Sequence, residues 1–298
     1  MMAGSLGKGV LGTVRRASLL PIRYGISPQR ILSRLQRLIT MVDRWECEPT
    51  IPVTASLLER YPTLARGVAG ADVAIHGYRH VSYPSLSTEE KRADLDSASR
   101  VFRSQGIMRT GFRAPYLQID DETLSLLRGA DFTFDSSTSS LALPEGSRLA
   151  DETKEFAISR YGRKQAAQIS PVHETPVEIP VSLPDDEILI DGLGLRSPTG
   201  LWHAYETMMQ TALSAGSHLV LQVHPERFHI YESALELLLE RSSDSGAWVA
   251  SLSSVADWLI KNGPRSRQWP RNSAFALSVT GDLDALSIRD FASRAWGA

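Results

Sequence analysis

Short apolar runs alternate with amphipathic helical patterns along most of the chain, and this alternation restricts the fold more than any other feature of the sequence. The helical spacing of apolar side chains is clear in Ile31–Val42, and runs of strand type are clear in Ala71–Ile75 and His218–Val223. Repeated strand–helix units favour a parallel sheet with helices outside it, which is the α/β class. Eight or nine such units without a long linker predict that residues 1–298 form one (β/α) barrel rather than two domains.

Capping signals mark several of the helices. Ser27-Pro28 predicts the start of the first helix, and Ser87 with Glu90 three residues later is a capping box. Ser197-Pro198 predicts the start of another helix, which we expect to end at Gly216. The segment 140–175 interrupts the rhythm, because it is polar with few large apolar residues. It is interpreted either as a solvated excursion with a short helix or as a flexible loop or flap over the site.

The composition excludes several classes of protein. An apolar fraction of 42% and a charged fraction of 22% are ordinary for a soluble globular chain and exclude disorder. A net charge of −2 argues against nucleic acid or an anionic membrane surface as a partner. No apolar run approaches the roughly 18 residues that a transmembrane helix needs. Cys47 is the single cysteine, so no disulfide within the chain is expected. The oligomeric state is not predicted.

The N-terminal region admits two interpretations. The first 42 residues contain Lys8 and six arginines, and Asp43 is the first acid. This pattern suits a transit peptide, whereas the continuous apolar stretch of a secretory signal is missing. Several of the arginines also fall on the polar face of the first expected helix, and we therefore expect a soluble, cytoplasmic protein.

Two histidines form the first candidate site. An apolar strand delivers His76 to its carboxyl end, and His80 follows four residues later. If the chain turns helically there, both imidazoles share one face, which suits a metal ion. A His-x3-His pair alone is more often a pair of surface histidines, so the context has to decide.

Further polar residues follow other apolar strands. Arg113-Ala-Pro115-Tyr116 follows one strand, and Leu221-Gln-Val-His224 ends another. The carboxyl ends of strands are where barrel enzymes build their active sites. Taken alone, Arg113 and His224 are more often structural residues.

Together and in this order, these segments resemble the polysaccharide deacetylases, carbohydrate esterase family four. That family has a histidine pair on one strand, an Arg-x-Pro-aromatic motif on the next and a Leu-x-x-His motif near the end. The region from Glu178 to Asp186 also resembles the family, less specifically. The resemblance runs from about Ile22 to Leu252 and implies a distorted barrel of seven to eight strands.

The chain departs from the family at the motif Thr-Phe-Asp-Asp, which in the family ends the first strand. The run Leu20–Ile26, interpreted as the first strand, contains no acid. A similar motif, Thr280-Gly-Asp282-Leu-Asp284, lies near the C-terminus after the apolar run Phe275–Val279. We therefore expect the C-terminal strand to lie beside the first strand, although a hairpin with solvated acids is the alternative. If these acids lie elsewhere, Asp72, Asp135 and Asp185 become the candidate ligands.

A second departure is Gly77, where the family usually has serine or threonine after the first histidine. In the family that residue braces the metal loop. Its replacement puts the rigidity of the loop in question but not the ligands themselves.

The resemblance implies a role for each candidate residue. Asp284, His76 and His80 hold a divalent metal, zinc by expectation, with cobalt, manganese or nickel as alternatives. Asp282 is the base, kept ionised by Arg113, and His224 protonates the leaving amine. The backbone near Pro115 and Tyr116 stabilises the oxyanion.

The implied activity is metal-dependent hydrolysis that removes an N-acyl group, most simply acetyl, from an amino sugar in a glycan or glycolipid. Two alternatives stay open. One is a deformylase or cyclic-amide hydrolase of the same fold, and the other is a non-catalytic carbohydrate-binding relative.

Overall fold

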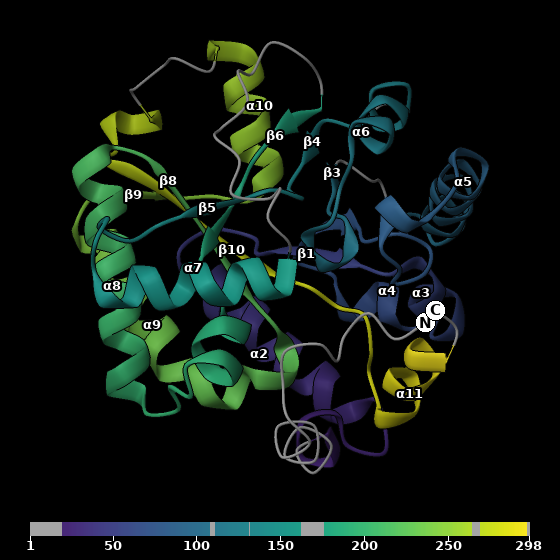
Figure 1. The fold of residues 1–298 in the computed structure, drawn as a ribbon, viewed down its shortest axis with the longest axis horizontal. Helices are drawn as coiled ribbons and strands as arrows, with labels where there is room; N and C mark the ends of the chain where they lie inside the picture. The colour runs from purple at the N-terminus through teal and green to yellow at the C-terminus, as the bar shows by residue number, and fades with distance from the viewer. Residues whose placement is uncertain (1–19, 108–110, 131, 162–175, 264–268, 297–298) are drawn as a thin grey trace.

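The structure is a computed structural model that describes residues 20–107, 111–130, 132–161, 176–263 and 269–296. Within these described residues, ten parallel strands form one sheet at the centre, with helices around it (Figure 1). The strands are β1 (Thr50–Val53), β2 (Asp72–Ile75), β3 (Gly111–Phe112), β4 (Phe134–Asp135), β5 (Ser139–Leu141), β6 (Val177–Glu178), β7 (Val181–Leu183), β8 (His218–Val223), β9 (Ala247–Val249) and β10 (Phe275–Gly281). The α/β class is confirmed.

The sheet closes into a distorted barrel. Its strand order is β5-β7-β8-β10-β1-β2-β3-β4-β6, and β9 pairs with β10. Its two ends meet because β4 continues into β5, and β6 continues into β7, after short breaks. Backbone hydrogen bonds from Ile179 N to Asp135 O (2.7 Å) and from Val181 N to Thr138 O (2.9 Å) bridge the breaks. If β4 and β5 are counted as one interrupted strand, and β6 and β7 as another, the described part of the barrel has seven strands, with β9 beside β10. This number agrees with the predicted seven to eight.

The C-terminal strand β10 lies in the middle of this sheet, between β8 and β1. It aligns Thr280 with Thr50 of β1 and runs alongside β8 over six residue pairs. All seven of its residues are buried, as expected for a parallel strand covered on both faces. The predicted insertion of the C-terminal strand beside the first strand is therefore confirmed.

The first strand itself is not the predicted one. Residues 20–24 are helical, and the first strand of the barrel is β1. A short apolar run such as Leu20–Ile26 fits a helix turn as well as a strand, because its length does not resolve the periodicity. Here Arg23 and Tyr24 are buried while Ile22 and Ile26 are exposed.

Helices surround the barrel as the alternating pattern predicted, with α8 and α9 packed side by side (Figure 1). Ser87 and Glu90 form the expected capping box of α5, and Ser197 and Gly216 cap α8. The helices are α2 (Gln29–Asp43), α3 (Ala55–Arg60), α4 (Leu64–Gly67), α5 (Thr88–Ser104), α6 (Asp121–Arg128), α7 (Arg148–Tyr161), α8 (Pro198–Ala215), α9 (Phe228–Asp244), α10 (Leu252–Asn262) and α11 (Ile288–Trp296). Among the helices that the structure describes, none has the length and apolarity needed to cross a bilayer.

The segment 140–175 is partly described. Its first residues belong to β5, and residues 148–161 form α7, which crosses the front of the barrel in Figure 1. Tyr161 at the end of α7 packs in an apolar cluster with Leu117 and Val181. Residues 162–175 lie outside the described residues, so the proposed flap stays a prediction.

Candidate active site

Strand β2 ends at Ile75 and delivers His76 to the mouth of the barrel. The Nδ1–H of His76 donates to the carbonyl oxygen of Arg113 over 2.7 Å, which leaves the lone pair on Nε2. That Nε2 is buried without a hydrogen-bond partner and lies 3.8 Å from Asp282 Oδ2. Burial lowers the pKa of His76, which favours the neutral imidazole. A buried neutral imidazole with a free Nε2 lone pair is the state that a metal ligand requires.

Gly77 makes the turn that brings His80 back to the same site. Its φ of +74° favours glycine, and a Cβ there would lie 2.9 Å from the carbonyl oxygen of Arg79. Asp94 of α5 braces the loop, since its carboxylate accepts hydrogen bonds from the backbone N–H groups of Tyr78 (2.7 Å) and Arg79 (3.2 Å). The loop that lacks the family's serine or threonine is therefore held by a carboxylate from a neighbouring helix.

His80 lies between His76 and Tyr116, with ring centroids 5.1 Å and 4.4 Å away. Its Nε2 is 3.2 Å from Asp284 Oδ2. Burial lowers the pKa of His80 well below its usual value. The structure thus brings both histidines of the pair next to the carboxylates that follow β10.

Asp282 and Asp284 lie beside β1 because the chain continues along it after β10. The N–H of Leu283 donates to Pro52 O over 2.8 Å, and the N–H of Thr54 donates to Leu283 O over 3.1 Å. Residues two apart in an extended chain point the same way, so both carboxylates face the mouth while Leu283 is buried in the core. The alternative of solvated acids in a C-terminal hairpin is therefore wrong.

Asp282 is held by two donors. Arg113 Nη1 donates to its Oδ1 over 2.8 Å, and Gln222 Nε2 donates to its Oδ2 over 2.9 Å. Burial alone would raise the pKa of Asp282, but the Arg113 guanidinium beside it holds that pKa below the usual value. The Arg113 side chain is completely buried and is fixed by Ser136 as well, so the position of the carboxylate is fixed too.

Asp284 has a different partner. Besides His80, its carboxylate forms an ion pair with Arg294 of α11. Although burial opposes ionisation, the Arg294 charge holds the pKa of Asp284 well below the usual range. Arg294 is a site residue that the sequence analysis missed, because nothing in the local pattern of α11 distinguishes it from a surface arginine.

His224 follows β8 and is paired with Asp186. Its Nδ1 lies 2.6 Å from Asp186 Oδ1, and its backbone N–H donates to Asp186 Oδ2 over 2.9 Å. Burial lowers the pKa of His224, but the Asp186 carboxylate more than offsets this and raises it to about 10. The imidazole is therefore charged at neutral pH and able to donate a proton.

The remaining sequence candidates are at the rim. Pro115 is buried, and Tyr116 is 37% exposed with a φ of +60°. Tyr116 packs edge-on against His80 and lines the same cavity as His224 and Asp282. The structure thus brings Arg113, His224, Asp282, Asp284, His76, His80, Pro115 and Tyr116 to one end of the barrel, while their individual roles stay predictions.

The three fallback acids have other contacts. Asp72 accepts a hydrogen bond from Thr50 Oγ1 over 2.8 Å, and Asp135 accepts one from Ser137 Oγ over 2.5 Å. Asp185 accepts one hydrogen bond from the backbone N–H of Ile188 over 2.8 Å and another from the hydroxyl group of Tyr161.

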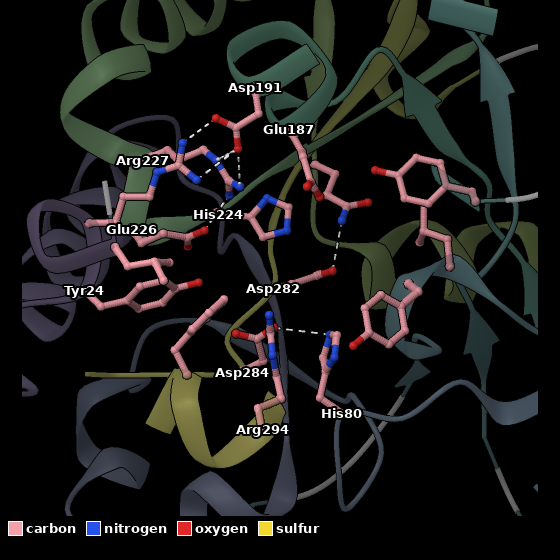
Figure 2. Close-up of a pocket in the computed structure, with 17 residues that line it drawn as sticks. Tyr24, His80, Glu187, Asp191, His224, Glu226, Arg227, Asp282, Asp284 and Arg294 are labelled. Atoms are coloured by element: carbon pink, nitrogen blue, oxygen red, sulfur yellow. Dashed lines mark hydrogen bonds and ion pairs between the residues drawn. The ribbon is translucent and has the colours of Figure 1, made fainter. Parts of the chain in front are cut away.

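A cavity of about 300 Å³ is lined by five of the site residues, namely His80, Tyr116, His224, Asp282 and Asp284. Figure 2 shows Asp282 and His224 near its centre, with His80, Asp284 and Arg294 on one side and Asp191, Glu226 and Arg227 on the other. Gln222 and Asp186 are functional candidates that the sequence analysis did not assign. The sequence pattern could have indicated Gln222, because residues two apart on a strand point to the same side and Gln222 lies two residues before His224.

The nitrogen and oxygen donors of His76, His80 and Asp284 are of the types that bind a divalent cation. The distance between two of these donors also fits such an ion. Two ligands of one tetrahedral ion, each roughly 2.0–2.1 Å from it, lie about 3.4 Å apart. The separation of 3.2 Å between His80 Nε2 and Asp284 Oδ2 is close to this, and the unpartnered His76 Nε2 supplies another buried donor. However, only pairs of these donors lie close together. The described part of the chain contains no preassembled group of three or more His, Cys, Asp or Glu ligands.

Comparison with known proteins gives a family match over part of the chain. Residues 32–134 match the sequence model of the polysaccharide deacetylase family. A peptidoglycan deacetylase-like protein of Gibberella zeae is 31% identical over 108 residues. The match covers 35% of this chain and spans about a third of that relative, 32% of its length.

Solved structures share the fold over a longer stretch. A putative polysaccharide deacetylase from Mycobacterium smegmatis has a TM-score of 0.61 at 22% identity, covering 88% of this chain and 87% of that one. A probable polysaccharide deacetylase from Pseudomonas aeruginosa PAO1 has a TM-score of 0.57 at 18% identity, covering 78% and 74%. An allantoinase has the same TM-score and coverage at 17% identity. Residues 32–134 are thus similar in sequence to the polysaccharide deacetylase family, and most of the chain shares the fold of these solved structures.

Proposed function

We propose that the protein is a metal-dependent hydrolase that removes an N-acyl group, most simply acetyl, from an amino sugar. The observation that carries the proposal is the convergence on one cavity of His224, paired with Asp186, and Asp282, paired with Arg113. Amide hydrolysis requires both, a base for the attacking water and an acid for the leaving amine.

Asp282 is the proposed base. Arg113 and Gln222 occupy one lone pair on each of its oxygens, which orients the carboxylate and keeps it ionised. It accepts the proton of the attacking water as the carbon–oxygen bond forms.

His224 is the proposed acid. Asp186 holds its Nδ1, so Nε2 is the nitrogen that carries the transferable proton. Donation of that proton to the amide nitrogen allows the carbon–nitrogen bond to break, and acetate and a free amine leave. The backbone near Tyr116 is the proposed oxyanion donor.

His76, His80 and Asp284 are the proposed ligands of a divalent ion, with zinc as the first choice. Such an ion supplies Lewis-acid polarisation of the substrate carbonyl and lowers the pKa of the attacking water. The ion pair between Arg294 and Asp284 has to loosen for Asp284 to act as a ligand.

The test is acetate release from chito-oligosaccharides by the purified chain, before and after chelation and after zinc is restored. The proposal predicts activity that is lost on chelation and regained with zinc. Formate release from N-formyl substrates instead would favour the deformylase. Binding of the oligosaccharide with no release in any metal state would favour the binding-only alternative, for which the Arg294–Asp284 pair is the supporting observation.

A further inference from the structure

Both ends of the described chain contribute to the lining of the cavity. Leu20, Arg23 and Tyr24 of the helical segment 20–24 line it, as do Phe291 and Arg294 of α11. These two segments are called the lid below. In Figure 2, Tyr24 lies at the left edge and Arg294 at the lower edge of the cavity.

The lid is held in place by specific contacts. The N–H of Ile288 donates to Gly25 O over 2.9 Å, and the rings of Tyr24 and Phe291 are 5.1 Å apart. Arg23 Nη1 donates to Asp191 Oδ2 over 3.0 Å, which ties the segment to the helical turn Glu187–Gly192 after β7. Because the two segments of the lid are bonded to each other and to the rest of the protein, they limit what can enter the cavity.

A partition limits the cavity on another side. A second cavity of about 340 Å³ lies next to the first, lined by Arg60, Tyr78 and Arg79 among others. His80, Asp284 and Arg294 line both cavities. His80 and Asp284 lie between the two spaces and, as the proposed metal ligands, stay there when Arg294 leaves Asp284, so they interrupt a continuous groove through the site.

The charge of the lining also restricts the ligand. Among the described residues, the three arginines that line the cavity are paired with acids of the same lining: Arg23 and Arg227 with Asp191, and Arg294 with Asp284. A paired guanidinium is a weak attractor for a further anion, whereas the remaining polar atoms suit hydroxyl groups.

We propose that this site takes one uncharged, hydroxyl-bearing ring at a time, as a single amino sugar or as the end unit of a chain. The inference rests on the proposed function and names its substrate class. A cavity of about 300 Å³ is at the small end of ligand pockets, which run from roughly 300 to 1,000 Å³. The interior of a polymer needs an open groove on both sides of the reacting unit, whereas this cavity is bordered by Leu20, Tyr24 and Phe291 of the lid and by His80 and Asp284 of the partition.

The first experiment measures binding by calorimetry with the full chain, using N-acetylglucosamine and chitopentaose as probes. One-ring binding predicts equal affinities within about threefold, since extra rings add no contacts. A pentamer that binds more than about tenfold tighter would overturn the inference, and so would the absence of binding by both probes. This readout does not depend on catalysis, so one-ring binding without acetate release would overturn only the proposed function.

The position of the product amine distinguishes a chain end from the interior. Tandem mass spectrometry of chitopentaose after partial reaction should find the free amine at one terminal unit. Free amines at interior units would contradict the proposal.

Lid variants supply the second arm. Phe291→Ala and, as the milder change, Leu20→Ala shorten side chains that line the cavity, and each should increase the affinity for the pentamer relative to the single ring. Ile22→Ala is the matched control, because Ile22 is in the same helical segment but 56% exposed. Unchanged pentamer affinity in a folded lid variant would overturn the role of the lid.

Discussion

Arg113 Nη1 donates a hydrogen bond to Asp282 Oδ1 over 2.8 Å, although 169 positions separate the two residues in the chain. The contact joins the strand end after β3 to the strand end after β10. Both side chains are buried, so the pair is strongly coupled and each partner depends on the other. It places the displaced acidic motif in the same site as the histidine pair.

Asp282→Asn should lower turnover by about 10² or more while leaving metal affinity nearly unchanged, because it removes the proposed base but not a proposed ligand. Steady-state kinetics and metal titration measure the two effects. Thr280→Val is the matched control, since Thr280 Oγ1 also accepts from Arg113 Nη1, over 2.9 Å. Equal losses in both variants would mean that Asp282 acts only by positioning Arg113.

Asp186→Asn should move the alkaline limb of the activity profile to lower pH. With the carboxylate present, His224 keeps its proton until the pH approaches about 10. If its pKa returns to about 6.5, roughly 3% is protonated at pH 8, and the rate there falls about 30-fold. Asp151→Asn, on the exposed face of α7, is the control. An unshifted limb would exclude His224 as the acid.

The same pair predicts a pH dependence of stability. The pKa of His224 is higher in the folded chain than in the unfolded chain, so the pairing stabilises the fold fully below about pH 6.5. This contribution should disappear as the pH rises towards about 10. Urea unfolding of the wild type and of Asp186→Asn across that range should show the difference in unfolding free energy shrinking with rising pH. A constant difference would contradict the assignment.

Gly77→Ser should destabilise the protein, even though serine is a usual residue at this place in the family. Serine at a positive φ costs about 1–2 kcal/mol, and its Cβ would also meet the carbonyl oxygen of Arg79 at 2.9 Å. Gly106→Ser is the control, since its φ is +70° with nothing within 4 Å of the new Cβ. Equal losses of unfolding free energy in the two variants would show that the contact with Arg79 does not matter.

Asp94→Asn should loosen the histidine loop. It weakens the two backbone hydrogen bonds that hold Tyr78 and Arg79, with an expected loss of about 1–3 kcal/mol in unfolding free energy. Metal affinity should fall about 10–100-fold, as for other partners that orient ligands. Asp96→Asn, exposed on the same helix, should change neither quantity. Metal affinity that stays at the wild-type value would show that Asp94 does not brace the loop.

The sequence allowed much of the fold to be predicted where local signals are strong. Capping residues predicted the starts of α5 and α8, and an apolar run predicted the strand β8. The insertion of β10 was predicted because the expected first strand contains no acid, so that the carboxylates had to come from another part of the chain. The interpretation of Leu20–Ile26 as a strand failed because so short an apolar run also fits a helix. The lid was not predicted because it depends on long-range contacts such as the one between Arg23 and Asp191, 168 positions apart.

The proposed metal site combines a carboxylate that follows β10 with two histidines that follow β2. A crystal structure with zinc added, recorded at the zinc absorption edge, tests this most directly. We expect one strong anomalous peak within about 2.0–2.3 Å of His76 Nε2, His80 Nε2 and an Asp284 oxygen, with Arg294 displaced from that carboxylate. A crystal with no peak at this site, or a peak held by the histidines while Asp284 stays paired to Arg294, would contradict the account.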